Sequence, residues 1–149
     1  MIFSMAVFQD QLYAAVTSST GEAEGVLWRS ADGEAWDAVT PDGLLEAASR
    51  PYGYGAMAAV EDTLFISSTP HGGSVPHVWM SPDGQRWERL TTDEQFATAN
   101  AIPTLCGFHG RLYVGTFSFS RGEFATSAGA AIWRFTPPRE SASGDPDRF

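Results

Sequence analysis

Short runs of alternating apolar and polar residues recur along the chain, and Gly, Asp and Pro separate them. Alternation with period two predicts half-buried β-strands. Residues 5–16, 58–67 and 106–116 share one shape: an apolar run, a short polar turn, and a second run that begins with Leu and an aromatic residue. Each of these segments therefore predicts a pair of antiparallel strands.

A second shared pattern, W-x-S-x-D-G-x-x-W, covers residues 28–36 and again residues 79–87. Asp-Gly is a strong signal for a tight hairpin, because glycine accepts a positive φ and aspartate tolerates one. The Ser and Asp side chains can accept hydrogen bonds from the N–H groups of their own turn, so we interpret them as structural. The residues of these two turns are Ser30, Asp32, Gly33, Trp36, Ser81, Asp83, Gly84 and Trp87.

Together the two patterns give a repeat of about 50 residues with four strands in each unit. This period and strand number are typical of the blade of a β-propeller. The predicted fold is all-β, with about three four-stranded antiparallel blades at about 5–40, 56–91 and 104–135, the third incomplete. We predict a partial propeller over residues 1–136 and a disordered tail over residues 137–149.

The Asp-Gly hairpins resemble the Asp-box, or BNR, repeat of propellers such as sialidases and some glycoside hydrolases. Leu112 to Thr116 and Ile132 to Arg134 are also similar to this broad group. The resemblance covers about residues 5–135. It implies a propeller scaffold, and it implies no particular activity.

Charge and composition exclude several classes of function. The formal net charge is −9, which argues against a nucleic acid or an anionic membrane surface as partner. The sequence contains arginine but no lysine, which excludes Schiff-base chemistry and a P-loop. Neither a signal peptide nor an apolar run of membrane-spanning length is visible, so we expect a soluble chain of unpredicted compartment.

The metal-ligating and nucleophilic residues form no recognisable set. His71, His77 and His109 have no Cys or acidic residue at ligand spacing, so we expect surface histidines and neither a metal site nor a cofactor. Cys106 is the only cysteine, and its place in an apolar strand predicts a small core residue. No Gly-x-Ser-x-Gly elbow supports serine hydrolysis.

Loop lengths indicate where a ligand would bind. The first and third turns of each blade are tight and lie at one end, whereas the long second loops and the connections between blades lie at the other. Aromatic and polar residues at that long-loop end could bind a carbohydrate or a protein. The candidates are Arg50, Tyr52, Tyr54, Asn100, Phe119, Arg121 and Glu123.

Two functions follow from these observations. The first is a non-catalytic scaffold that binds its ligand at the long-loop end. The alternative is a fragment or a subunit of a sialidase-like or glycoside-hydrolase-like propeller enzyme whose catalytic residues are not all in this chain. The acidic residues at 32, 61, 62 and 83 lie at the opposite end from the candidates.

Three blades do not close a propeller, because closed rings have about four to eight. Both end blades should then expose an apolar face, which monomers rarely tolerate. We expect one of three outcomes: two copies that form a ring of about six blades, a different chain that supplies the remainder, or a longer parent protein.

Overall fold

The computed structural model describes residues 2–16, 26–39, 53–69, 75–118 and 129–137. Within these ranges every regular element is a β-strand, and the strands form three antiparallel sheets. The prediction of an all-β fold is confirmed. Among the residues that the structure describes, none forms a helix with the length and apolarity that a membrane crossing needs.

Each sheet is a meander in which consecutive strands pair, and we call the three sheets blades 1, 2 and 3. Blade 1 consists of β1 (Ile2–Phe8), β2 (Gln11–Val16), β3 (Val26–Ser30) and β4 (Asp37–Val39). Blade 2 consists of β5 (Gly53–Val60), β6 (Thr63–Thr69), β7 (Val78–Ser81) and β8 (Glu88–Arg89). Blade 3 consists of β9 (Ala101–Phe108), β10 (Arg111–Ser118) and β11 (Gly129–Phe135).

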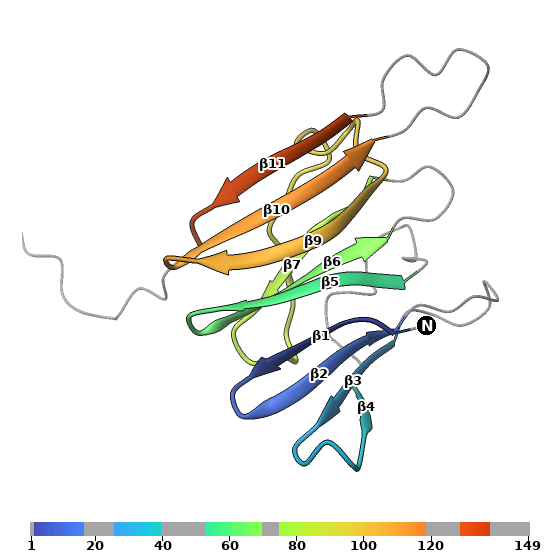
Figure 1. The fold of residues 1–149 in the computed structure, drawn as a ribbon, viewed down its shortest axis with the longest axis vertical. Coiled ribbons are helices and arrows are strands. Elements are labelled where there is room, and N and C mark those ends of the chain that lie inside the picture. The colour runs from blue at the N-terminus through green and yellow to red at the C-terminus, as the bar shows by residue number, and fades with distance from the viewer. Residues whose placement is uncertain (1, 17–25, 40–52, 70–74, 119–128, 138–149) are drawn as a thin grey trace, which may run out of the picture.

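The blades stack face to face in chain order, with blade 2 in the middle (Figure 1). The first strands β1, β5 and β9 contact one another in succession along the stack. Meander sheets stacked in this way through neighbouring first strands are blades of the propeller type. The first strands begin at residues 2, 53 and 101, a few residues before the predicted blade starts at 5, 56 and 104.

Two-residue turns join the first two strands of every blade. Gln9 and Asp10 both have positive φ, as do His109 and Gly110, and Glu61 does so in blade 2. Positive φ at the central residues is the conformation that matches the twist of a two-residue hairpin. These turns gather at one end of the stack, together with the Asp-Gly turns that follow β3 and β7.

The apolar core consists of two clusters, one between each pair of adjacent blades. The cluster between blades 1 and 2 contains Phe8, Tyr13, Ala15, Leu27, Met57, Leu64, Ile66, Trp79 and Trp87. The cluster between blades 2 and 3 contains Ala56, Val60, Phe65, Val78, Phe96, Ile102, Leu105, Leu112 and Val114. Alternate residues of β6 therefore serve opposite faces of blade 2, because side chains of a strand alternate between its faces.

We call the face that a blade turns toward the next blade its forward face, and the opposite one its rear face. The rear face of blade 1 and the forward face of blade 3 meet no neighbour among the described residues, and we call them the terminal faces. Their exposed apolar residues are Phe3, Met5 and Val7 on blade 1 and Phe108, Phe117 and Ile132 on blade 3.

Cys106 corrects an expectation. Its strand is a first strand, as predicted, but the thiol is exposed and not part of the core. Cys106 pairs with Tyr113 on the forward face of blade 3, where no further blade covers it. Pro137, the first residue of the predicted tail, is buried, and residues 138–149 lie outside the described part of the chain.

Candidate functional site

The two Asp-Gly turns have the same set of internal hydrogen bonds. In blade 1 the Gly33 N–H donates to Ser30 Oγ at 2.8 Å, and Asp32 Oδ1 accepts from the N–H groups of Glu34 and Ala35 at 2.8 and 2.9 Å. The Ser30 hydroxyl also donates to Asp32 Oδ1 at 3.2 Å. The turn therefore satisfies its own donors with its own side chains.

In blade 2 the Gly84 N–H donates to Ser81 Oγ at 2.8 Å, and Asp83 Oδ1 accepts from the N–H groups of Gln85 and Arg86 at 2.9 and 2.8 Å. The Arg86 Nε donates to the other carboxylate oxygen at 2.9 Å. The Ser81 hydroxyl donates to Asp83 Oδ1 at 3.2 Å, so Asp83 accepts from four donors of its own turn.

These hydrogen bonds lower the pKa of both carboxylates. The N–H groups of Ala35 and Glu34 lower the pKa of Asp32. Partial burial raises the pKa of Asp83. The N–H groups of Arg86 and Gln85 and the Arg86 side chain lower it by more, so that its pKa is about 2. A general acid in glycoside hydrolysis needs a raised pKa, so both residues are unsuited to that role.

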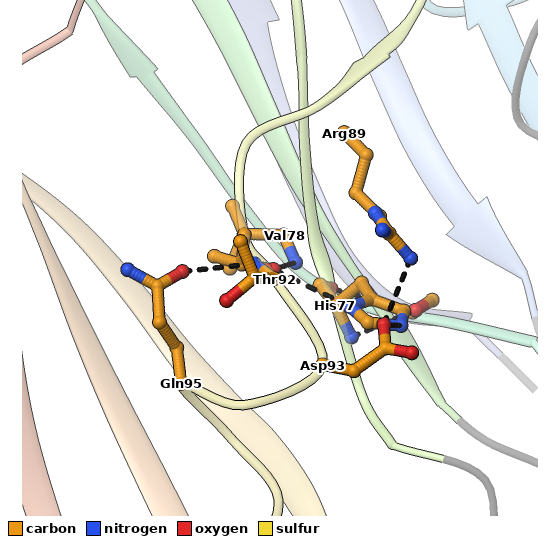
Figure 2. A network of polar contacts seen from close by, with 8 residues as sticks. His77, Val78, Arg89, Thr92, Asp93 and Gln95 are labelled. Atoms are coloured by element: carbon orange, nitrogen blue, oxygen red, sulfur yellow. Dashed lines mark hydrogen bonds and ion pairs between the residues drawn. The ribbon is translucent and has the colours of Figure 1, made fainter.

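At the opposite end, a polar network ties the connection after β8 to the start of β7 (Figure 2). His77 Nε2 lies 3.4 Å from Asp93 Oδ1, and Arg89 donates to the same oxygen at 2.9 Å. His77 Nδ1 lies 3.4 Å from the hydroxyl of Thr91, which accepts from the Val78 N–H at 3.1 Å. In the same connection Gln95 Oε1 accepts from the Thr92 N–H at 2.9 Å.

His77 was expected at the surface, and it is instead 8% exposed. Asp93 covers its Nε2 side, and the ring stands edge-on to Trp79 with centroids 6.5 Å apart. Burial lowers the pKa of His77, and Arg89 lowers it further against the opposing effect of Asp93, so the imidazole is neutral near pH 7. The repeat contained a signal for this burial, because Val26, an apolar residue, occupies the same position in blade 1.

The network holds a connection in place and offers little chemistry. Thr91 is 2% exposed and its hydroxyl already accepts a hydrogen bond, so it is not an available nucleophile. Among the described residues, no group of three or more His, Cys, Asp or Glu side chains could hold a metal ion.

Most of the predicted ligand-binding residues fall outside the described part of the chain: Arg50, Tyr52, Phe119, Arg121 and Glu123. Tyr54 is described as a backbone position of β5, paired with Ser68 of β6. Asn100 is exposed at the long-loop end, and its N–H donates to the Phe117 carbonyl at 2.8 Å. Asn100 thereby joins the connection before β9 to the end of β10.

No protein-family model matches this chain, and no curated protein matches it either. Two solved structures that resemble it are of the GH32 β-fructofuranosidase of Bombyx mori, and one of them is a mutant in complex with sucrose. Both share 15% sequence identity with this chain, cover 90% of it and have a TM-score of 0.49. The chain spans 34% of the length of these structures. The fold described above depends on the sheets and their order, and not on this match.

Proposed function

We propose that this chain is a three-blade segment of a β-propeller that acts as a non-catalytic binding scaffold once further blades cover its terminal faces. A single observation supports this most strongly. Positions that are buried between blades inside the stack have exposed apolar equivalents at its two ends.

The forward faces make the comparison direct. Leu27 of blade 1 and Val78 of blade 2 are both 0% exposed, whereas Ile132 at the same position of blade 3 is 83% exposed. The rear faces show the same difference in exposure. Met57 of blade 2 and Leu105 of blade 3 are 6% and 8% exposed, whereas Met5 at the same position of blade 1 is 48% exposed. Exposing an apolar side chain of this size forgoes about 1.5–3 kcal/mol of burial free energy, so several such residues favour a covering surface.

The long-loop end is the proposed ligand-binding end. At the opposite end Asp32 and Asp83 already accept hydrogen bonds from their own turns, whereas loops held by a rigid scaffold are free to vary and bind. The His77 network supports this assignment, because it anchors the connection between blades 2 and 3 at that end. The candidate residues named above remain the predicted ligand contacts, and a carbohydrate or a protein remains the predicted ligand class.

A second candidate is a fragment or a subunit of a sialidase-like or glycoside-hydrolase-like propeller enzyme, whose repeats the Asp-Gly hairpins resemble. In that case the catalytic acid is neither Asp32 nor Asp83, because both have lowered pKa values. In both candidate functions the described blades supply a scaffold.

Two assays separate these candidates. The purified chain is applied to a glycan panel and, in parallel, is incubated with aryl-sialosides and other aryl-glycosides. We expect glycan binding that Asn100→Ala weakens and that Asp10→Asn, at the opposite end, leaves unchanged. Turnover of an aryl-glycoside by this chain alone would overturn the non-catalytic assignment, and binding that is insensitive to changes at the long-loop end would overturn the location.

A further inference from the structure

We infer that the surface covering the terminal faces is a second copy of this chain. The forward face of blade 3 in one copy packs on the rear face of blade 1 in the other, and the two copies form a closed ring of about six blades. This inference rests on the proposed function, since it names the partner that completes the propeller.

The forward face of blade 3 carries the same aromatic pair that blade 1 packs against blade 2. Phe8 and Tyr13 pack with ring centroids 6.3 Å apart at 57°, and both are buried against blade 2. Phe108 and Tyr113 occupy the same positions of blade 3, with centroids 6.3 Å apart at 61°. Phe108 is nevertheless 59% exposed. The same aromatic pair is therefore preformed on a face that lacks its partner.

Polar groups on the two terminal faces match in the same way. Inside the stack the Met57 N–H donates to Ser4 Oγ at 3.0 Å, a hydrogen bond between blades 1 and 2. The equivalent residues at the ends are Met5 on blade 1 and Thr104 on blade 3, and Thr104 keeps a hydroxyl and is exposed. We expect the Met5 N–H of one copy to donate to Thr104 Oγ1 of the other.

The first turns provide a second match. Gln9 Nε2 of blade 1 donates to the Pro82 carbonyl in the Asp-Gly turn of blade 2 at 2.9 Å. His109 occupies the position of Gln9 in blade 3, and Ala31 occupies the position of Pro82 in blade 1. An imidazole N–H can replace the amide donor, so His109 of one copy can donate to the Ala31 carbonyl of the other.

The two Asp-Gly glycines show where the second copy fits. A Cβ on Gly84 would meet the Tyr13 side chain, with Cζ at 2.7 Å, because Tyr13 of blade 1 lies over this turn. A Cβ on Gly33 would meet nothing within 4 Å. Tyr113 has the position of Tyr13 and can occupy this open space from the other copy.

The number of described blades is compatible with a pair. Two copies of three blades make six, within the about four to eight of closed propellers, whereas three copies would make nine. The contact is head-to-tail, with a different face from each copy, and a two-fold axis along the ring axis makes both contacts identical.

Light scattering of the unmodified chain tests the inference, together with two variants that each alter one terminal face. We expect a mass of twice 16.1 kDa for the unmodified chain and 16.1 kDa for Ile132→Arg and for Val7→Arg. Both residues are highly exposed, so circular dichroism should show unchanged strand content. Ala97→Arg, on the exposed connection before β9, adds the same charge away from both faces and should remain a dimer.

Mixing the two variants distinguishes head-to-tail pairing from pairing of like faces. A mixture contains one intact contact, between blade 3 of the Val7→Arg chain and blade 1 of the Ile132→Arg chain. We expect the mixture to form heterodimers at raised concentration. If like faces paired instead, mixing the two variants would not restore a dimer. A monomeric mixture alongside a dimeric unmodified chain would overturn the head-to-tail geometry.

A cross-link gives an independent readout. Cys106 is the only cysteine and lies on the forward face of blade 3. In Val7→Cys, a short bis-maleimide should join residue 7 to residue 106 of different copies, and mass spectrometry identifies the linked peptides. Within one chain the two residues lie at opposite ends of the stack, so a link between them must join different copies. Absence of this link would overturn the inference.

The outcomes separate this inference from the proposed function. A folded monomer that binds a glycan at the long-loop end overturns the second copy and leaves the scaffold in place. A dimer that binds no glycan or protein ligand leaves the ring in place and overturns the binding function.

Discussion

The two Asp-Gly hairpins share their main hydrogen bonds and differ mainly in their neighbours, although Arg86 adds a side-chain donor in blade 2 that Ala35 cannot supply in blade 1. Both turns have a Ser Oγ that accepts from the glycine N–H at 2.8 Å and an Asp Oδ1 that accepts two further N–H groups. In blade 2 the glycine lies under Tyr13 of blade 1, whereas the glycine of blade 1 is open. The turn sequence therefore determines local geometry, and the adjacent blade determines how much each residue contributes to stability.

The largest contrast should come from the tryptophans that begin the return strands. Trp87 is 4% exposed within the core between blades 1 and 2, whereas Trp36 is half-buried. Trp87→Ala should lower the free energy of unfolding by about 3–5 kcal/mol and Trp36→Ala by about 1–2 kcal/mol. Urea unfolding, in the Ile132→Arg background that keeps the terminal faces open, measures both. Equal losses would show that blade 2 gains nothing from its neighbour.

Substituting the glycines should give the next largest difference. Gly84→Ala meets Tyr13 in addition to the strain of a positive φ, and should cost about 2–4 kcal/mol. Gly33→Ala has only the backbone strain, about 1–2 kcal/mol. The same unfolding assay applies, and Tyr13→Phe should recover part of the loss in Gly84→Ala but none in Gly33→Ala. No recovery in either chain would contradict the contact between blades.

The serines should differ because their donors differ in exposure. Ser81→Ala leaves the buried Gly84 N–H without its acceptor and should cost about 1–3 kcal/mol. Ser30→Ala exposes the Gly33 N–H to water and should cost about 0.5–1.5 kcal/mol. Backbone amide exchange at residues 33 and 84 reports the result directly, since only residue 84 should be strongly protected in the unmodified chain.

The aspartates should differ in their response to acid. Because the folded pKa of Asp83 is about 2 and its ordinary value is 3.8, its stabilising effect is complete above pH 3.8 and is lost as the pH falls through about 2. After allowance for solvent screening this is about 1 kcal/mol at pH 7. Thermal unfolding of Asp83→Asn should differ most from the unmodified chain at pH 7 and converge with it near pH 2. Asp32→Asn should have the smaller effect at every pH.

His77 should give the smallest effect, in a separate pH range. Its folded pKa is lowered, so the unfolded chain binds the proton first and stability falls as the pH drops below 6.5. The groups that face the ring are Arg89 and Asp93. Comparing urea midpoints at pH 7.5 and 5.5, His77→Gln should show a smaller decrease than the unmodified chain. The comparison is made in the Ile132→Arg background, and a decrease that His77→Gln leaves unchanged would contradict this role of the ring.

The local elements were predictable because their signals lie within a few residues of one another. Alternation predicts the strands, and Asp-Gly between tryptophans predicts two hairpins with hydrogen bonds to their own side chains. The burial of His77 was not predictable from its own loop, because Asp93, sixteen residues later, folds back over it. Cys106 was assigned to the core from its strand, but burial depends on which face has a neighbour. Most candidate ligand contacts lie on the long loops, where such local signals are absent.

The repeated aromatic pair gives the stack a direction. Because Phe8–Tyr13 and Phe108–Tyr113 both lie on forward faces, only one of the two terminal faces carries such a pair, and the two ends of the stack are different surfaces. A gene with this property can grow by tandem duplication of one repeat, since each added unit inherits a surface that fits its predecessor.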